Sequence, residues 1–244
     1  MKKAIENLGI EGIKKLVKKF EKELKIPSHL HLDYILNAVC NNPELAPDLT
    51  TREDCKNLLD DERVEKWVSV FYTAYQNRYN YCVLKATQTK PDKALEVFMQ
   101  TANDWTDDEL GQAINSHRMA MSAENIIGLI LELFLDEKLK AHGWALAWGS
   151  AVAHVDLCSS TGNMLQVKNR YNSENSSSKQ VRKDHKIDLW YRTKSSGKDN
   201  WEKLHEIIGN HSSINSELTE EKFLQYIKEL TTKIKDEKKN KAKE

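Results

Sequence analysis

Residues 156–170 form the segment that most restricts how this chain can fold. An apolar run ends at Asp156, a Gly-Asn pair follows at Gly162, and the next residues alternate between apolar and polar. A Gly-Asn pair between two apolar runs is typical of a tight turn, and the alternation is typical of a strand. We therefore predict a β-hairpin. Gln166 and Lys168 are two residues apart, so they point to the same side of their strand and converge with Asp156 at one end.

These side chains suggest a chemistry. Mg²⁺ is a hard ion that prefers oxygen ligands, and a neighbouring ammonium can orient water or stabilise developing negative charge. Asp156 fits the ligand role and Lys168 the ammonium role, while Gln166 offers a neutral oxygen where a carboxylate would be usual. The backbone carbonyl of Val167 lies between them and is a further predicted metal ligand. His154, two residues before the aspartate on the same predicted strand face, is interpreted as a packing or indirect partner.

A further acid comes from the preceding segment. Glu124, Gly128, Glu132 and Asp136 fall at steps of four, so they share one stripe of a predicted helix. Glu124 and Glu132 would lie about 12 Å apart along its axis, so at most one is a direct metal ligand. We predict Glu132 in that role. The alternative is that the stripe faces water. Ordinary alternatives also exist for the hairpin residues, as a turn aspartate, a solvated strand lysine and a glutamine that binds no metal.

Composition limits the possible classes of protein. The chain has 244 residues with zero formal net charge, and 39% of them are hydrophobic, which is enough for a core. No run of 18 apolar residues occurs, so we expect no membrane span. The lysine-rich N-terminus lacks the pattern of a secretory signal. The four cysteines include no Cys-x-x-Cys pair, which predicts neither a zinc cluster nor a disulfide framework and fits the cytoplasm.

Charge is unevenly distributed along the chain. Residues 92–137 contain ten acidic and two basic residues, whereas residues 165–198 contain nine basic and three acidic ones. An acidic region beside a basic one suits a site that holds cations and also grips an anion. The alternative is two solvated surfaces that differ in sign.

The chain has a helical first half and a mixed α/β core from about residue 120 onwards. We predict a helical N-terminal region over 1–118, a core over 119–235 and a charged, frayed tail over 236–244. Residues 67–75 and 187–192 fit either a helix or a strand. The helices are predicted at 1–25, 29–41, 53–85, 92–102, 106–118, 123–141 (capped by Ser122), 200–209 and 219–235, and a polar loop at 171–180.

An aspartate followed by Gln-x-Lys, after a helix that carries a glutamate, resembles the PD-(D/E)xK nuclease core. Longer strings are more specific, namely the polar stretch from Gln166 to Ser178 followed by Arg182 and Trp190-Tyr-Arg192, and Ser122 to Glu132 followed by Gly143-Trp144. They resemble the SinI family of type II restriction endonucleases over about residues 117–204. The resemblance implies an α/β fold, with a mixed central sheet flanked by helices.

The same resemblance implies Mg²⁺-dependent cleavage of double-stranded DNA at GG(A/T)CC by a homodimer. It assigns Asp156 as a metal ligand and Lys168 as the catalytic lysine. Gln166 stands where the superfamily usually has an acid, which favours one metal ion over two. Arginine pairs with guanine edges, asparagine with adenine edges, and serine contacts phosphate. The predicted DNA-binding residues are Asn169, Arg170, Asn172, Ser173, Asn175, Ser176, Ser177 and Arg182, with Arg192 as a weaker candidate.

Two other functions remain open at this point. One is a structure- or damage-specific DNA nuclease with the same core. The other is a non-catalytic DNA-binding module in which Gln166 marks the loss of metal binding. On composition alone, the polar stretch from residue 171 to 180 would also fit a flexible, solvated turn.

Overall fold

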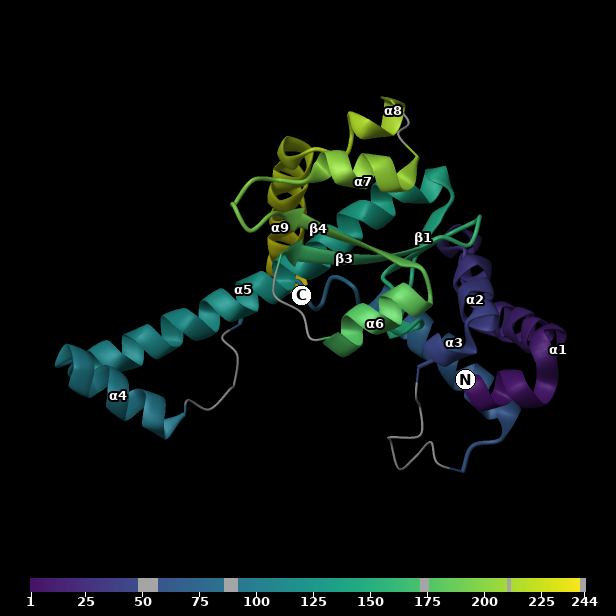
Figure 1. Ribbon diagram of the computed structural model, residues 1–244, viewed down its shortest axis with the longest axis horizontal. Helices are drawn as coiled ribbons and strands as arrows, with labels where there is room; N and C mark the ends of the chain where they lie inside the picture. Colours follow the sequence, from purple (N-terminus) through teal and green to yellow (C-terminus); the bar gives the residue numbers. More distant parts are fainter. Residues whose placement is uncertain (48–56, 86–91, 172–175, 210–211, 242–244) are drawn as a thin grey trace.

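The computed structural model describes residues 1–47, 57–85, 92–171, 176–209 and 212–241. Helices and one small sheet alternate along this part of the chain (Figure 1). The helices are α1 Lys2–Glu23, α2 Leu32–Asn41, α3 Asp60–Gln76, α4 Lys93–Asn103, α5 Asp107–Leu139, α6 Ser176–Asp184, α7 Trp201–Ile208, α8 Ser212–Asn215 and α9 Glu220–Lys241. The strands are β1 Trp144–Leu146, β2 Leu157–Ser159, β3 Met164–Arg170 and β4 Ile187–Thr193. Short 3-10 turns are η1 Ser28–Leu30, η2 Pro43–Leu45, η4 Lys140–His142 and η5 Trp148–Ser150.

The four strands form one mixed sheet in the order β1-β2-β3-β4. β2 pairs antiparallel with β1 and with β3, and Leu157 lies opposite Leu165. β3 and β4 run parallel, with Lys168 opposite Tyr191. The predicted hairpin is therefore confirmed. Its turn contains Gly162 at a φ of 90°, a backbone conformation that favours glycine. The ambiguous segment 187–192 is a strand.

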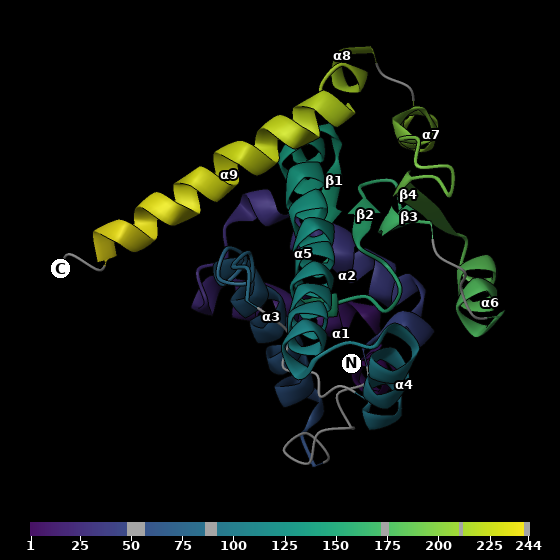
Figure 2. The same ribbon diagram turned by 90° about the vertical axis from the view of Figure 1, so that its left-hand side faces the viewer.

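The crossover from β3 to β4 contains α6, which begins at Ser176. A polar loop over 171–180 was therefore a wrong prediction for its second half. Two parallel strands need a crossover connection, which is usually a helix. Serine and asparagine are typical of turns, and their presence favoured a loop over the crossover helix in the prediction. Figure 2 shows α5 on one side of β3 and β4 and α6 on the other.

Helix α5 is a single helix of 33 residues, about 50 Å long at the usual rise. Thr106 caps it, because its hydroxyl accepts a hydrogen bond from the Glu109 N–H while the Glu109 carboxylate accepts one from the Thr106 N–H. The predicted second start at Ser122 was wrong. Alanines and methionines flank this serine, and neither glycine nor proline interrupts the helix there. The C-terminal half of α5 supplies buried Leu131 and Phe134.

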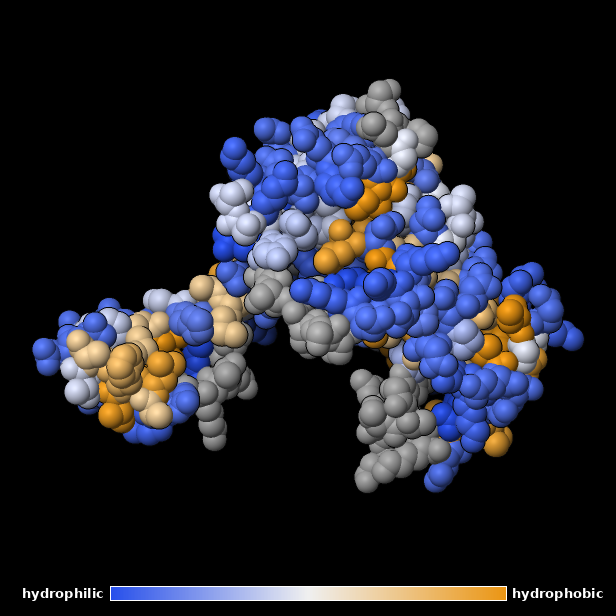
Figure 3. Space-filling view, in the orientation of Figure 1, coloured by the Kyte–Doolittle hydropathy of each residue, from blue (hydrophilic) through white to orange (hydrophobic). Residues whose placement is uncertain are grey.

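The N-terminal half of α5 projects from the body of the protein and carries α4 beside it (Figure 1). We call α4 and the adjoining part of α5, residues 93–124, the arm. Residues on α4 are not buried, and Leu95, Val97 and Phe98 are exposed. The space-filling view shows apolar residues gathered on this end of the molecule (Figure 3).

The N-terminal helices pack into the same core as the sheet. The α1 stripe that includes Ile13, Val17 and Phe20 is buried, as predicted, although the helix is kinked at Gly9. Residues 67–75 are helical, as part of α3, and Trp67, Val68 and Phe71 are buried. The predicted helix over 53–85 is wrong for 57–59 and 77–85, which are not helical, and residues 53–56 lie outside the described residues. The indole N–H of Trp67 donates to the carbonyl of Ala151 at 3.0 Å, which ties α3 to the loop before β2.

Helices α7 and α9 cover β4 and the C-terminal half of α5. Trp190 of β4 contacts Trp201 of α7 with ring centroids 5.0 Å apart, and Phe134 of α5 contacts Phe223 of α9 at 5.5 Å. α9 continues to Lys241, so residues 236–241 are helical and the prediction of a frayed tail was wrong for them. The predicted division between residues 118 and 119 lies inside α5, and separate roles for the two regions stay a prediction. None of the described helices is long and apolar enough to cross a membrane.

Candidate active site

Asp156 is held at the junction of three strands. Its N–H donates to the carbonyl of Leu165 at 2.9 Å, and its carbonyl accepts from the N–H of Ala147 at 2.8 Å. Its carboxylate Oδ2 accepts a 2.6 Å hydrogen bond from the N–H of Val167. The Asp156 carboxylate therefore accepts a β3 backbone N–H that would otherwise pair with a neighbouring strand. Backbone geometry, more than side-chain packing, fixes its position.

Glu132 joins Asp156 from α5, and both side chains line a cavity of about 410 Å³ together with Arg78 and Trp148. The pKa of Glu132 is raised to about 8, mainly by burial and also by the negative charge of Asp156, against the opposing effect of the Lys168 ammonium. Burial also raises the pKa of Asp156, against the effect of the Val167 N–H and of Lys168. The structure thus brings together the two predicted acids and the predicted lysine, while their chemical roles stay predictions.

Two neighbouring carboxylates with raised pKa values are an arrangement that a divalent cation would stabilise. Among the described residues, no group of three or more histidine, cysteine, aspartate or glutamate side chains could hold a metal ion. Mg²⁺ does not require such a group, because it is commonly bound by one or two carboxylates and keeps several waters or substrate oxygens. Glu132 and Asp156 therefore fit a Mg²⁺ ion that completes its coordination with neutral oxygens.

Gln166 has a partner that the sequence did not indicate. Its Oε1 accepts a 2.9 Å hydrogen bond from Nη1 of Arg182 on α6, and both residues are buried. A guanidinium is a positive charge next to an oxygen that was predicted to bind a positive metal ion. A metal-ligand role for Gln166 and a base-reading role for Arg182 stay predictions. In this arrangement the pair links α6 to β3.

The three weaker candidates lie in different surroundings. His154 was expected on a strand face beside Asp156, and this was wrong: it lies in a turn with a φ of 62° and its side chain is exposed. Two residues, Val155 and Asp156, separate this turn position from β2, because β2 begins only at Leu157. Glu124 is exposed on the arm. Asp136, on the same stripe, is partly buried and accepts a hydrogen bond from the Leu146 N–H.

Arg192, the third weaker candidate, belongs to a network between β3, β4 and α9. Its Nε donates to the side-chain oxygen of Asn169 at 3.0 Å, and its guanidinium pairs with the carboxylate of Glu220. Glu220 also accepts a 2.9 Å hydrogen bond from the indole of Trp201. Asn169, predicted to bind DNA, is thereby fixed against the neighbouring strand.

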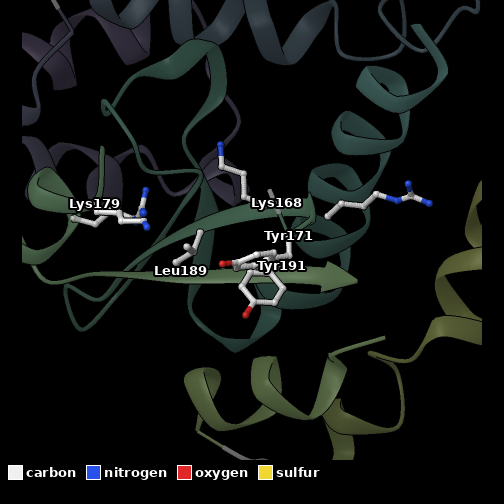
Figure 4. Close-up of a pocket in the computed structure, with 7 residues that line it drawn as sticks. Lys168, Tyr171, Lys179, Leu189 and Tyr191 are labelled. Carbon is white, nitrogen blue, oxygen red and sulfur yellow. The ribbon is translucent and has the colours of Figure 1, made fainter. Parts of the chain in front are cut away.

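The exposed face of β3 and β4 forms a second cavity of about 340 Å³ toward α6, which we call the tyrosine pocket. Tyr171 and Tyr191 lie edge to face in it, with ring centroids 5.1 Å apart. Figure 4 shows their rings together beside β4, with Lys168 extending from β3 and Lys179 from α6. Arg170 and Arg182 complete the basic lining, and Leu189 adds an apolar contact.

Sequence reasoning missed four lining residues of this pocket, namely Tyr171, Lys179, Leu189 and Tyr191. A signal existed for Tyr191, because pairing 187–192 as a strand parallel to β3 places it beside Lys168. Of the predicted DNA-binding residues, Asn172, Ser173 and Asn175 lie outside the described residues. Ser176 and Ser177 open α6.

Comparison with known proteins supplies an independent observation. The sequence matches the family described as SinI restriction endonuclease over residues 29–233. It is 34% identical over 152 residues to the type II restriction enzyme Eco47I of Escherichia coli, and 33% identical over 153 residues to the type II restriction enzyme SinI of Salmonella infantis. Each match covers 60% of this chain and 64% of the relative, so the chain spans slightly less than two thirds of the length of these curated relatives. The resemblance predicted from residues 117–204 is confirmed, and the match extends into the N-terminal helices.

Proposed function

Because the chain belongs to the SinI restriction endonuclease family, we propose that it is a type II restriction endonuclease that hydrolyses double-stranded DNA with Mg²⁺. The observation that carries this proposal is the meeting of Glu132, Asp156 and Lys168 at the open side of the β2–β3 hairpin. Two carboxylates and an ammonium from two separate elements of the fold, an α-helix and a hairpin, are the set that the reaction needs.

In this proposal Glu132 and Asp156 would hold the metal ion, and the backbone carbonyl of Val167 would be an additional ligand. Mg²⁺ bound there would supply an activated water molecule and offset negative charge on the reacting phosphate. The hydrogen bond from the Val167 N–H keeps the Asp156 carboxylate in a fixed orientation against β3. The Lys168 ammonium interacts electrostatically with both acids, and in this proposal it stabilises negative charge that develops on the phosphate oxygens. Gln166 is uncharged, and its hydrogen bond with Arg182 links β3 to α6.

The proposed substrate is duplex DNA containing GG(A/T)CC. Arg170 is exposed at the end of β3, which supports a contact between this arginine and a guanine edge. Lys179 is exposed on α6 beside the same cavity and suits a phosphate contact. The basic character of residues 165–198 supports this choice of face.

A homodimer is part of the proposal, because a two-fold symmetric pair of sites matches a palindromic sequence. The arm is the surface best suited to join two copies. It exposes Leu95, Val97 and Phe98, and residues 92–124 contain seven acidic and two basic residues, a charge that disfavours contact with DNA phosphates. The three described cysteines, Cys40, Cys82 and Cys158, are buried free thiols, which supports a reducing cytoplasm as the compartment.

Digestion of plasmid DNA tests the proposal directly. The protein with Mg²⁺ should give discrete fragments whose ends, once sequenced, all derive from GG(A/T)CC. Discrete fragments with other ends would support restriction activity and show that the recognition sequence is not GG(A/T)CC. Smears or cleavage only of damaged DNA would favour a structure- or damage-specific nuclease. If no DNA is cut and calorimetry with Ca²⁺ detects no metal binding in the presence of DNA, the protein is a non-catalytic DNA-binding module.

A further inference from the structure

The tyrosine pocket is a separate cavity from the one that Glu132 and Asp156 line. Its described lining residues come from β3, β4, α6 and the residue that follows β3, and Lys168 is the member that the proposed catalytic site also uses. A ligand in this pocket would therefore lie next to the lysine without displacing either acid.

The lining combines two kinds of recognition. Lys168, Arg170, Lys179 and Arg182 surround the cavity with positive charge, which suits a phosphate group. Tyr171 and Tyr191 supply aromatic surface between these cations, and Tyr171 is 51% exposed although its ring has an aromatic neighbour. Alternating cations and aromatic rings are the means by which proteins hold unpaired nucleotides, because a base stacks on a ring while the phosphate contacts a cation.

The size of the pocket separates the possible ligands. Its volume of about 340 Å³ lies at the lower end of the range of about 300–1,000 Å³ for small-molecule sites. A duplex does not fit into such a space. A lone backbone phosphate fits, but it would leave the exposed tyrosine surface without a partner. A single nucleotide uses both the cations and the rings.

We propose that the tyrosine pocket holds one nucleotide of the bound DNA that has turned out of the duplex, with its base against Tyr171 and Tyr191 and its phosphate beside Lys179. This inference rests on the proposed function, since it requires duplex DNA bound at the β3–β4 face. The inference adds a site for a base that has left the DNA double helix. Enzymes use such sites when the distortion of the DNA or the base itself contributes to recognition.

Fluorescent base analogues test this directly. Each base of the cleaved sequence is replaced in turn, purines by 2-aminopurine and pyrimidines by pyrrolocytosine, and Ca²⁺ replaces Mg²⁺ so that the DNA stays intact. Both analogues brighten when they leave the stack. One position should show a several-fold rise in emission when the wild-type protein binds, and the other positions should stay quenched.

Matched variants assign the signal to the pocket. Tyr191→Ala and Tyr171→Ala should remove the emission rise and weaken binding by about 5- to 100-fold, the cost of losing one stacked base. Tyr191→Phe should retain the rise, because the ring remains. Tyr34→Ala, which removes a tyrosine stacked on His31 in the N-terminal region, is the control for losing a tyrosine elsewhere. Lys179→Ala should weaken binding more than Lys183→Ala, whose lysine is exposed on the same helix and does not line the pocket.

The outcomes separate this inference from the proposed function. If the wild-type protein cuts the unmodified duplex with Mg²⁺ but no analogue brightens at any position, the nucleotide site is wrong and the nuclease stands. A rise that persists in both alanine variants also overturns the site. If no duplex is bound or cut, the proposed function fails and this inference fails with it.

Discussion

The carboxylate of Asp156 accepts a 2.6 Å hydrogen bond from the backbone N–H of Val167. Val167 lies between Gln166 and Lys168 in β3, so this bond holds the Asp156 carboxylate against the part of the strand that also carries the lysine. The spacing between the two catalytic candidates is therefore set by the β2–β3 register. Small shifts in that register would separate them.

Asp156→Asn and Lys168→Ala should each lower the rate of DNA cleavage by about 10³-fold or more, while DNA binding survives. The asparagine keeps the shape and an oxygen that can accept the Val167 N–H but loses the negative charge. Single-turnover cleavage and gel-shift affinity with Ca²⁺ measure the two effects. The control is Asp184→Asn, which alters an exposed aspartate at the end of α6. Near wild-type cleavage by either site variant would refute the assignment.

Glu132 should make the metal-free protein less stable as the pH rises. Its pKa is about 8 in the folded state, above the ordinary value of about 4.3 in the unfolded chain, so the folded state holds the extra proton. This contribution to stability is fully present below pH 4 and is lost as the pH rises to about 8. Glu132→Gln removes the ionisation and should raise the melting temperature at pH 8.5, with a smaller difference at pH 5.

Each kcal/mol gained should raise the melting temperature by about 2–4 °C in a chain of this size. Glu124→Gln is the matched control, because this residue is exposed on the same helix and should show the same melting temperature as wild type at both pH values. Equal melting curves for Glu132→Gln and wild type at pH 8.5 would contradict the buried, charged state of Glu132.

The sequence predicted the hairpin and the three groups at its open side because their signals are local. Alternation marks β3, the Gly-Asn pair marks the turn, and an acid that interrupts an apolar helix marks Glu132. Those signals depend on the spacing of neighbouring residues, which the folded state preserves. The helical N-terminal region and the α/β core followed from the same periodicities, whereas the mixed central sheet was implied by the family resemblance.

Interactions between distant segments were not predictable in the same way. Nothing near Gln166 indicates that its oxygen bonds to Arg182, because α6 must first cross over the sheet. The ion pair between Arg192 and Glu220 was equally unpredictable, because it joins β4 to α9, which are distant in the sequence. Ser122 shows the opposite error. Serine favours helix starts, but the continuous helical propensity of the residues around Ser122 outweighs that preference.

The hydrogen bond between Gln166 and Arg182 should contribute to stability as a coupled pair. Arg182→Ala would leave the buried amide oxygen without this donor, at a cost of about 1–3 kcal/mol in the free energy of unfolding. Gln166→Ala should cost a similar amount, and the double variant less than the sum of the two. Denaturant unfolding of the four proteins measures the coupling. Additive losses would show that the two side chains do not interact in solution.

The arm should hold two copies of the protein together. Phe98 is 68% exposed and Leu95 is 54% exposed on the same helix, so burying them against a second copy would supply apolar contact that the monomer does not. Phe98→Glu and Leu95→Glu place additional negative charge on a surface that is already acidic, and each should convert a dimer into a monomer in analytical ultracentrifugation. Leu224→Glu is the control, because Leu224 is 48% exposed on α9, away from the arm. A dimer that survives both arm substitutions, or a wild-type protein that is monomeric with and without DNA, would exclude the arm as the dimer surface.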